Sequence, residues 1–139
     1  MVSGLPIVTP ASFVLSRTGK LYYSNSGLRG GGAEAALAVE LINVAQTPRQ
    51  DLLAKLWYGL DAKDLGNGEY AGLQVNLDGF DIIAHNYQAA PDINVGAGAL
   101  LPSPGPWEFI IPRRSELVIT GLCSDTDNQR YAVLIAYPV

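Results

Sequence analysis

The chain has 139 residues, of which 48% are hydrophobic and only 16% are charged. This length fits a single domain, and the high hydrophobic content excludes an intrinsically disordered chain. The net charge of −4, with no basic cluster larger than Arg113–Arg114, excludes the electrostatic pattern of nucleic-acid-binding proteins and of polybasic membrane-binding segments.

The sequence predicts a protein that folds in a reducing compartment. Its only cysteine, Cys123, excludes an internal disulfide bond. The uncharged stretch Ile93–Trp107 is interrupted by glycine and proline and is not expected to span a membrane as a helix. The N-terminus lacks the layout of a secretory signal, so we expect synthesis and folding in the cytoplasm.

Fifteen glycines and nine prolines divide the chain into short segments, which favours strands joined by turns. Ser12–Ser16 and Lys20–Ser24 are predicted to be two strands on either side of a turn at 17–19. The segment Ala33–Ala45 is ambiguous, because a strand period fits Leu37–Val44 about as well as a helical period. We favour a strand there because the neighbouring segments are strands.

The second half of the chain continues this pattern. Leu52–Leu60 is predicted to be a strand with one fully apolar face, followed by a loop at 61–68. Gly72–Leu77 and Phe80–Ala84 flank Asp78-Gly79, the strongest two-residue turn signal in the chain, and predict a hairpin. A long stretch rich in small residues follows, and the remaining predicted strands are Trp107–Ile111, Glu116–Leu122 and Tyr131–Tyr137.

This spacing predicts an all-β protein, an antiparallel sandwich or barrel, in one domain that covers residues 1–139. Tyr131–Tyr137 is apolar on both faces, so we expect both to be buried, either between two layers of the domain or between subunits. Met1–Pro10 contains prolines and is a candidate for an extended N-terminal arm.

The histidine and cysteine content argues against catalysis. His85 is the only histidine, so zinc ligation would need several carboxylates, an unusual ligand set. A catalytic triad would also need His85 as its base, and the Gly-x-Ser-x-Gly motif of such enzymes is absent. A Cys123–His85 pair stays open at this point, although a small apolar residue near the core explains Cys123 as well.

The acidic pairs and the glycine run also have simpler explanations. Asp78/Asp81 and Asp125/Asp127 could serve glycosidase chemistry, but aspartates are typical of turns. The loop 125–129 lacks the glycine and the glutamate of a calcium loop. Arg29–Gly32 does not match the spacing of a nucleotide-binding loop. We therefore predict a non-enzymatic protein with no catalytic, cofactor-binding or metal-binding residues.

Two tryptophans, Trp57 and Trp107, and seven tyrosines are the remaining candidates for a binding surface. Most lie in predicted strands, so packing in the core or between subunits is favoured over a platform for sugars. A typical soluble domain has about 25% charged residues, and the lower value here indicates a surface that is partly covered by another molecule.

The segment Trp107–Val139 resembles the closing strands of small jelly-roll proteins found on the virions of tailed bacteriophages. It contains a strand, the proline turn Pro112–Ser115, a second strand, an Asp/Asn loop and the terminal strand Tyr131–Tyr137. Val39–Pro48 followed by Leu52–Leu60 is similar to another strand–turn–strand unit of the same group. The stretch Ala89–Pro106 matches no part of that pattern.

The resemblance implies a jelly-roll sandwich of about eight short strands. It also implies a capsid decoration or cement protein, often a homotrimer, that clamps neighbouring major capsid subunits on the surface of the virion. The alternative is a host-receptor or carbohydrate-binding module on a tail or fibre. A third hypothesis, a small hydrolase that uses paired acids, predicts two close carboxyl groups, one with a raised pKa.

Overall fold

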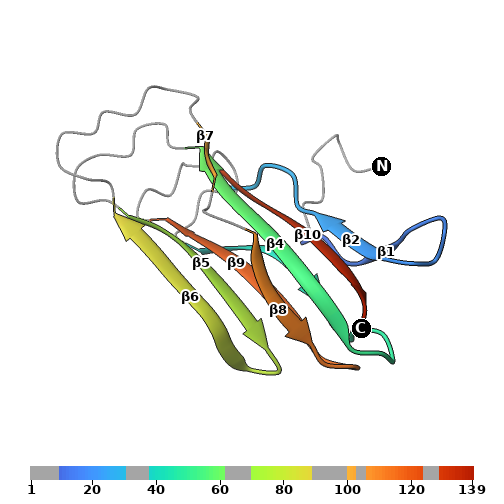
Figure 1. Ribbon diagram of the computed structural model, residues 1–139. Helices are drawn as coiled ribbons and strands as arrows, with labels where there is room; N and C mark the ends of the chain where they lie inside the picture. The colour runs from blue at the N-terminus through green and yellow to red at the C-terminus, as the bar shows by residue number, and fades with distance from the viewer. Residues whose placement is uncertain (1–9, 31–37, 62–69, 89–99, 103–105, 124–128) are drawn as a thin grey trace, which may run out of the picture.

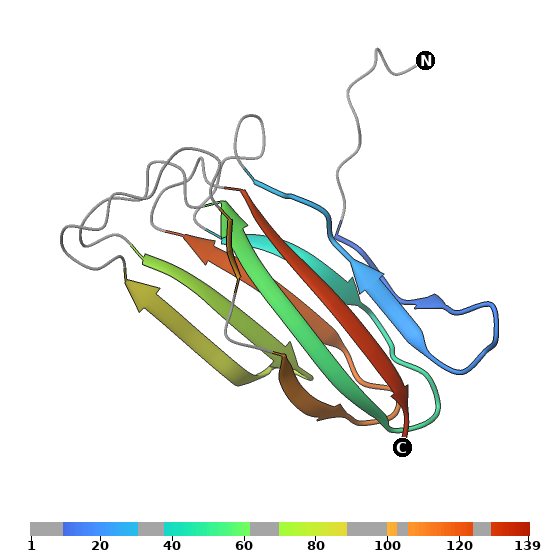
Figure 2. The same cartoon turned by 45° about the horizontal axis from the view of Figure 1, so that its top comes forward.

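The computed structural model describes residues 10–30, 38–61, 70–88, 100–102, 106–123 and 129–139. These residues contain no helix and form ten strands. The strands are β1 (Val14–Leu15), β2 (Tyr22–Asn25), β3 (Ala38–Val44), β4 (Leu52–Asp61), β5 (Tyr70–Leu77), β6 (Phe80–Gln88), β7 (Leu100–Pro102), β8 (Trp107–Ile111), β9 (Leu117–Cys123) and β10 (Arg130–Pro138). Figures 1 and 2 show them as two layers.

The two sheets have the topology of a jelly roll. The six-stranded sheet has the order β1-β2-β10-β4-β7, with β8 also paired to β4, and the four-stranded sheet has the order β3-β9-β5-β6. Strand β5 pairs with β6, β4 with β8, β3 with β9 and β2 with β10, and every pairing is antiparallel. The chain is therefore one long hairpin that is rolled up into a sandwich, and the predicted fold class is confirmed.

The turn residues fix the β5–β6 hairpin, which is the closed end of the long rolled-up hairpin. Asp78 and Gly79 have φ values of 51° and 90°, so both occupy the left-handed region. A two-residue turn with two positive φ angles matches the twist of the flanking strands, which explains the Asp-Gly signal. The first hairpin is also confirmed, with a shorter β1 than predicted and with Gly19 at a φ of 71° in its turn.

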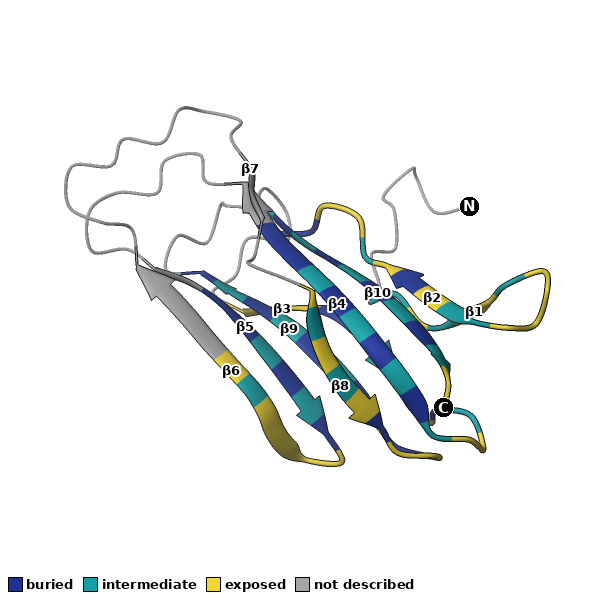
Figure 3. Ribbon diagram, viewed as in Figure 1, coloured by how far each residue is buried: buried dark blue, intermediate teal, exposed yellow. Residues whose placement is uncertain are grey.

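Alternating side chains build the core between the sheets. In β4, Leu52, Ala54, Leu56 and Tyr58 are buried, whereas the residues between them point to the opposite face (Figure 3). Strand β9 follows the same pattern, with Leu117 and Ile119 fully buried. The other core residues are Val39, Leu41, Ile42, Val44, Leu73, Val75, Leu77, Ile111, Ala132, Leu134 and Ala136.

The ambiguous segment 33–45 is a strand where it is described, at Ala38–Val44, and residues 31–37 lie outside the described residues. Strand β7 was not predicted, because Leu100–Pro102 is a short part of a stretch without a clear period. Residues 1–9 of the expected arm and most of the predicted loops at 61–68 and 125–129 also lie outside the described residues.

Strand β10 corrects one prediction. Arg130, Ala132, Leu134 and Ala136 are fully buried, but Tyr131, Val133, Ile135 and Tyr137 on the other face are only half-buried. The prediction that both faces are buried within one domain is therefore wrong. The reason is that β10 is a central strand of its sheet, and among the described residues only the four-stranded sheet forms a second layer over it. Burial between subunits stays a prediction.

Arg130 is the largest fully buried side chain, and its burial depends on a glycine in the opposite sheet. Its guanidinium group crosses the core and donates a hydrogen bond of 3.0 Å to the carbonyl oxygen of Gly121 in β9. A Cβ atom on Gly121 would lie 2.8 Å from the Arg130 Cδ and 3.1 Å from Leu41 Cδ1. Gly121 therefore leaves the space that the arginine fills.

Candidate interaction surface

The outer face of the six-stranded sheet is the candidate functional site, and we call it the apolar face. The strand register and the alternation of buried residues place its side chains on the surface opposite the core. Its apolar members are Val14, Tyr23, Leu53, Trp57, Ile110, Tyr131, Val133, Ile135 and Tyr137.

Cross-strand rows join these residues across four strands. One row contains Asn25, Val133 and Trp57. The next row contains Tyr23, Ile135, Lys55 and Glu108, and the third contains Tyr137, Leu53 and Ile110. Neighbours within such rows are about 5 Å apart, so the apolar side chains form one continuous surface.

Tyr131 extends this surface over a glycine. It lies directly opposite Gly59 of β4, and a Cβ atom on Gly59 would lie 2.5 Å from the Cζ and Oη atoms of Tyr131. The aromatic ring therefore packs on the bare backbone of β4. An aromatic ring over a glycine in this way covers the backbone and keeps the apolar face flat at this point.

Several of these side chains are open to solvent in the single chain. Val14, Tyr23 and Ile110 are 47%, 44% and 49% exposed, and the other apolar members are half-buried. Among the side chains that the structure describes, the charged ones on the face are Lys55 and Glu108, whose Nζ and Oε1 atoms are 3.9 Å apart. Such an exposed pair contributes little to stability. The nine apolar side chains make up most of the face.

The outer face of the four-stranded sheet, here called the polar face, differs in character. Polar side chains predominate on it: Glu40, Asn43, Gln74, Asn76, Asp81 and Thr120. Asp81 accepts hydrogen bonds of 3.0 Å from Asn76 Nδ2 and 2.9 Å from Gln74 Nε2, and these bonds lower the pKa of its carboxyl group. The polar face is therefore more polar than the apolar face, although Val118 lies on it and Phe80 and Ile82 of β6 are 76% and 43% exposed.

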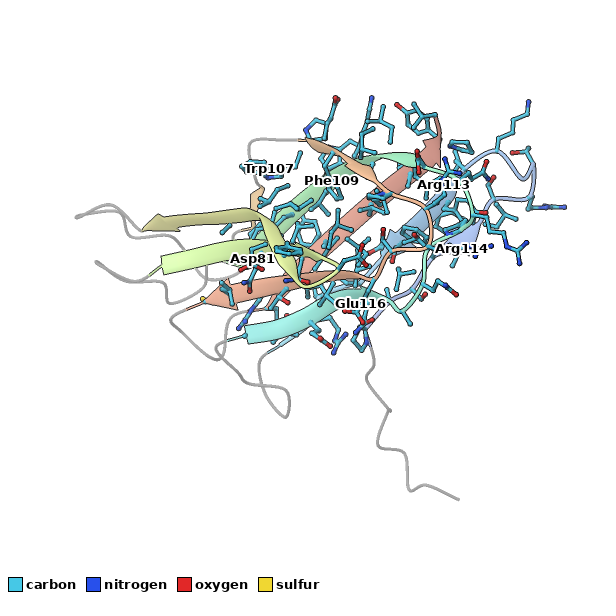
Figure 4. The ribbon with its side chains drawn as sticks, turned by 90° about the horizontal axis from the view of Figure 1, so that it is seen from below. Asp81, Trp107, Phe109, Arg113, Arg114 and Glu116 are labelled. Carbon is cyan, nitrogen blue, oxygen red and sulfur yellow. The ribbon has the colours of Figure 1, made fainter. Side chains whose placement is uncertain are left out.

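The turns at one end of the sandwich are tied together by hydrogen bonds. Ser115 N donates to Thr47 Oγ1 at 2.8 Å, and Thr47 Oγ1 donates to the carbonyl oxygen of Pro112 at 3.1 Å. Asp51 accepts hydrogen bonds from the backbone amide and the side chain of Arg113, which lower the pKa of Asp51. Figure 4 shows Arg113 at this end of the molecule, away from Asp81.

Of the acids that the structure describes, Asp78 has the predicted turn role, whereas Asp81 lies in strand β6, just after the turn. Asp78 Oδ1 accepts a hydrogen bond of 2.8 Å from Glu116 N, so Asp78 and Asp81 each serve a separate structural contact. The hydrolase hypothesis needs a raised pKa on an acid of such a pair, and the pKa of Asp81 is lowered. Asp125 and Asp127 lie outside the described residues.

The histidine and the cysteine do not share a strand pair. His85 is paired with Leu73 of β5, whereas the buried Cys123 is paired with Ala71. Strand β5 separates the two positions, so the backbone does not bring them together. Within the described residues, no group of three or more histidine, cysteine or acidic side chains is placed to hold a metal ion.

The structure describes Arg29 at the start of the glycine run and both tryptophans. Arg29 exchanges backbone hydrogen bonds of 2.7 Å and 2.8 Å with Arg130, and residues 31–37 lie outside the described residues. Trp107 points toward the core, beside Phe109 on β8, as Figure 4 shows. Trp57 lies on the apolar face in the same row as Asn25.

No protein-family model matches the chain, and no curated protein matches it. Among solved structures, the chain is similar to the infectious bursal disease virus Gx strain structure, with 14% identity and a TM-score of 0.47. It is also similar to the VP2 subviral particle of that virus, with 11% identity and a TM-score of 0.45. The alignments cover 86% of this chain but only 32% and 33% of those chains, so this chain spans about a third of their length.

Those scores are too low to support an inference about function. Among the residues that the structure describes, no helix has the length and apolar character needed to cross a bilayer.

Proposed function

We propose that this protein is a non-enzymatic structural protein of a virion. In this proposal it is a capsid decoration or cement protein that stabilises a bacteriophage head by clamping major capsid subunits. The observation that carries the proposal is the apolar face, a sheet surface with nine apolar side chains and one charged pair. A structural protein needs such a surface for permanent contacts, because obligate interfaces resemble the interior of a domain.

The fold is compatible with this role and with others. Jelly rolls occur in viral capsid proteins, in lectins and in cupins, so the topology alone does not decide between them. The sequence has a single histidine, which argues against a histidine-rich metal centre. Two roles remain, that of a capsid protein and that of a lectin. The resemblance of Trp107–Val139 to phage virion proteins favours the capsid role.

In this proposal the protein is made in the host cytoplasm and binds to the outer surface of the capsid. Its partners are further copies of itself, with a homotrimer favoured, and the major capsid protein. Residues 1–10 would form an arm that lies on a neighbouring subunit. Neither nucleic acid nor a membrane is a partner, in keeping with the net charge of −4.

A binding experiment with capsids tests the proposal. The purified chain is mixed with capsids of the virus that encodes it, after the native copies have been removed, and bound protein is measured by co-sedimentation. We expect saturable binding and capsids that resist heating better. A chain that is absent from purified virions and does not sediment with the capsids would contradict the proposal.

The second candidate function is a receptor- or carbohydrate-binding module on a tail or fibre. Trp57 favours it, because an aromatic side chain that is partly open to solvent can stack on a sugar, and Asn25 lies in the same cross-strand row with Val133 between them. Binding to a glycan array that Trp57→Ala abolishes would support this candidate. If Trp57→Ala binds the same glycans as strongly as the wild type, the sugar site lies elsewhere on the protein.

A further inference from the structure

We infer that a second copy of this chain covers the apolar face. The inference rests on the proposed structural function and deepens it, because it names the occupant of the surface and the residues that touch it. Strands β2, β10, β4 and β8 of one copy would pack against the same surface of another copy. Three features of the face support a second copy as the occupant.

The first feature is the distribution of charge. The whole chain has a net charge of −4, so association of two copies costs less where the surfaces that meet carry no net charge. Among the described residues, the polar face carries Glu40 and Asp81 and no basic side chain. Of the described side chains on the apolar face, the charged ones are Lys55 and Glu108, whose charges cancel. Of the two sheet surfaces, it is therefore the one on which a second acidic copy meets less repulsion.

The second feature is the choice of side chains. Tyrosine and tryptophan are enriched at the energetic centres of protein interfaces, and the face contains Tyr23, Trp57, Tyr131 and Tyr137. Lys55 and Glu108 are 37% and 55% exposed and only loosely paired, so they remain available to a neighbour. Because they have opposite signs, a copy of the same face offers each of them a complementary charge.

The third feature is size. Four strands about 4.8 Å apart and seven residues of about 3.3 Å each give a flat footprint of about 440 Å². A standard interface buries about 800 Å² on each partner, so the face provides about half of that area. An interface of this size gives reversible association in solution, and several such contacts side by side on a shell give much tighter binding.

A matched pair of variants tests the inference by sedimentation velocity and light scattering between about 1 and about 100 µM. Val133→Lys puts a charge at the centre of the apolar face, between Asn25 and Trp57. Val118→Lys puts the same charge on the polar face, between Asn43 and Asn76. Both valines are half-buried and lie on central strands, so the two changes perturb the fold alike.

We expect the wild type and Val118→Lys to form a dimer at the higher concentrations, because a surface that packs against the same surface of another copy closes at two copies. We expect Val133→Lys to associate at least about 100-fold more weakly, because a lysine without a partner would be buried in the contact. Ile135→Glu is a second test that keeps the monomer intact, since the new carboxylate would lie opposite Lys55. It should dissociate the assembly as well.

A wild type that stays monomeric over the whole range would overturn the inference, and so would a Val133→Lys variant that associates normally. Equal dissociation of the two lysine variants would overturn it too, because the loss of association would then not be specific to the apolar face. Capsid binding by a chain that is monomeric in solution would leave the proposed function standing and reject the second copy.

Discussion

Gly121→Ala should destabilise the protein because Arg130 has nowhere to move. The new Cβ would lie 2.8 Å from the Arg130 Cδ, closer than real Cβ contacts allow, and 3.1 Å from Leu41 Cδ1. Arg130 and Leu41 are both fully buried, so neither side chain has solvent to move into. Overpacking of this kind costs about 1–3 kcal/mol. For a chain of 139 residues, each kcal/mol lowers the Tm by about 3 °C.

Gly59→Ala is the matched control for this prediction. Gly59 also lies in a central strand, and its Cβ would also meet a large side chain, the ring of Tyr131. That ring lies on the outer face and is able to swing into solvent, so we expect the smaller loss of stability. Urea denaturation of both variants measures the difference. A Gly121→Ala variant within about 0.5 kcal/mol of the wild type would refute the reasoning about Arg130.

Two further substitutions probe hydrogen bonds. The backbone amide and side chain of Arg113 lower the pKa of Asp51. Ionised Asp51 therefore stabilises the fold above its unfolded pKa of about 3.9. This contribution is lost as the pH falls through the lower pKa of the folded state. Asp51→Asn should therefore be less stable than the wild type at about pH 7, with a gap that closes toward about pH 2 in urea denaturation, and a constant gap would contradict this cause. The hydroxyl of Ser24 is buried without a hydrogen-bond partner, so Ser24→Ala should raise the unfolding free energy by about 1 kcal/mol in the same assay, whereas a loss would show that the hydroxyl is bonded.

The strands and the central hairpin were predictable because their causes are local. Leu52–Leu60 alternates between apolar and mixed positions, and only one of these two sets faces the core. Asp78-Gly79 supplies the positive φ angles that a tight hairpin needs. Such signals depend on residues a few positions apart, so the sequence contains all the information needed to find them.

Arg130 was not predictable because its position depends on a residue in another sheet. An arginine beside a polar loop is typical of a turn, and the space for it comes from Gly121, which faces it across the core. The register between β10 and β9 is set by the whole rolled-up hairpin. No local pattern around either residue indicates that they meet.

The apolar face was predictable in part. The two apolar faces of Tyr131–Tyr137 and the low charge content indicated a covered sheet surface. Which residues join β10 on that surface depends on the strand order, since Tyr23 comes from β2 and Ile110 from β8. Only the fold brings these distant segments together.

The most direct test of the account is the environment of Trp57, the tryptophan of the apolar face. In Trp107→Phe it is the only tryptophan, so its fluorescence reports on that face alone. If the face is covered in the assembly, its emission should shift to shorter wavelength and resist quenching by acrylamide as the protein concentration rises, and Trp57→Phe should lose this response. Identical emission and quenching in dilute and concentrated protein would contradict the account.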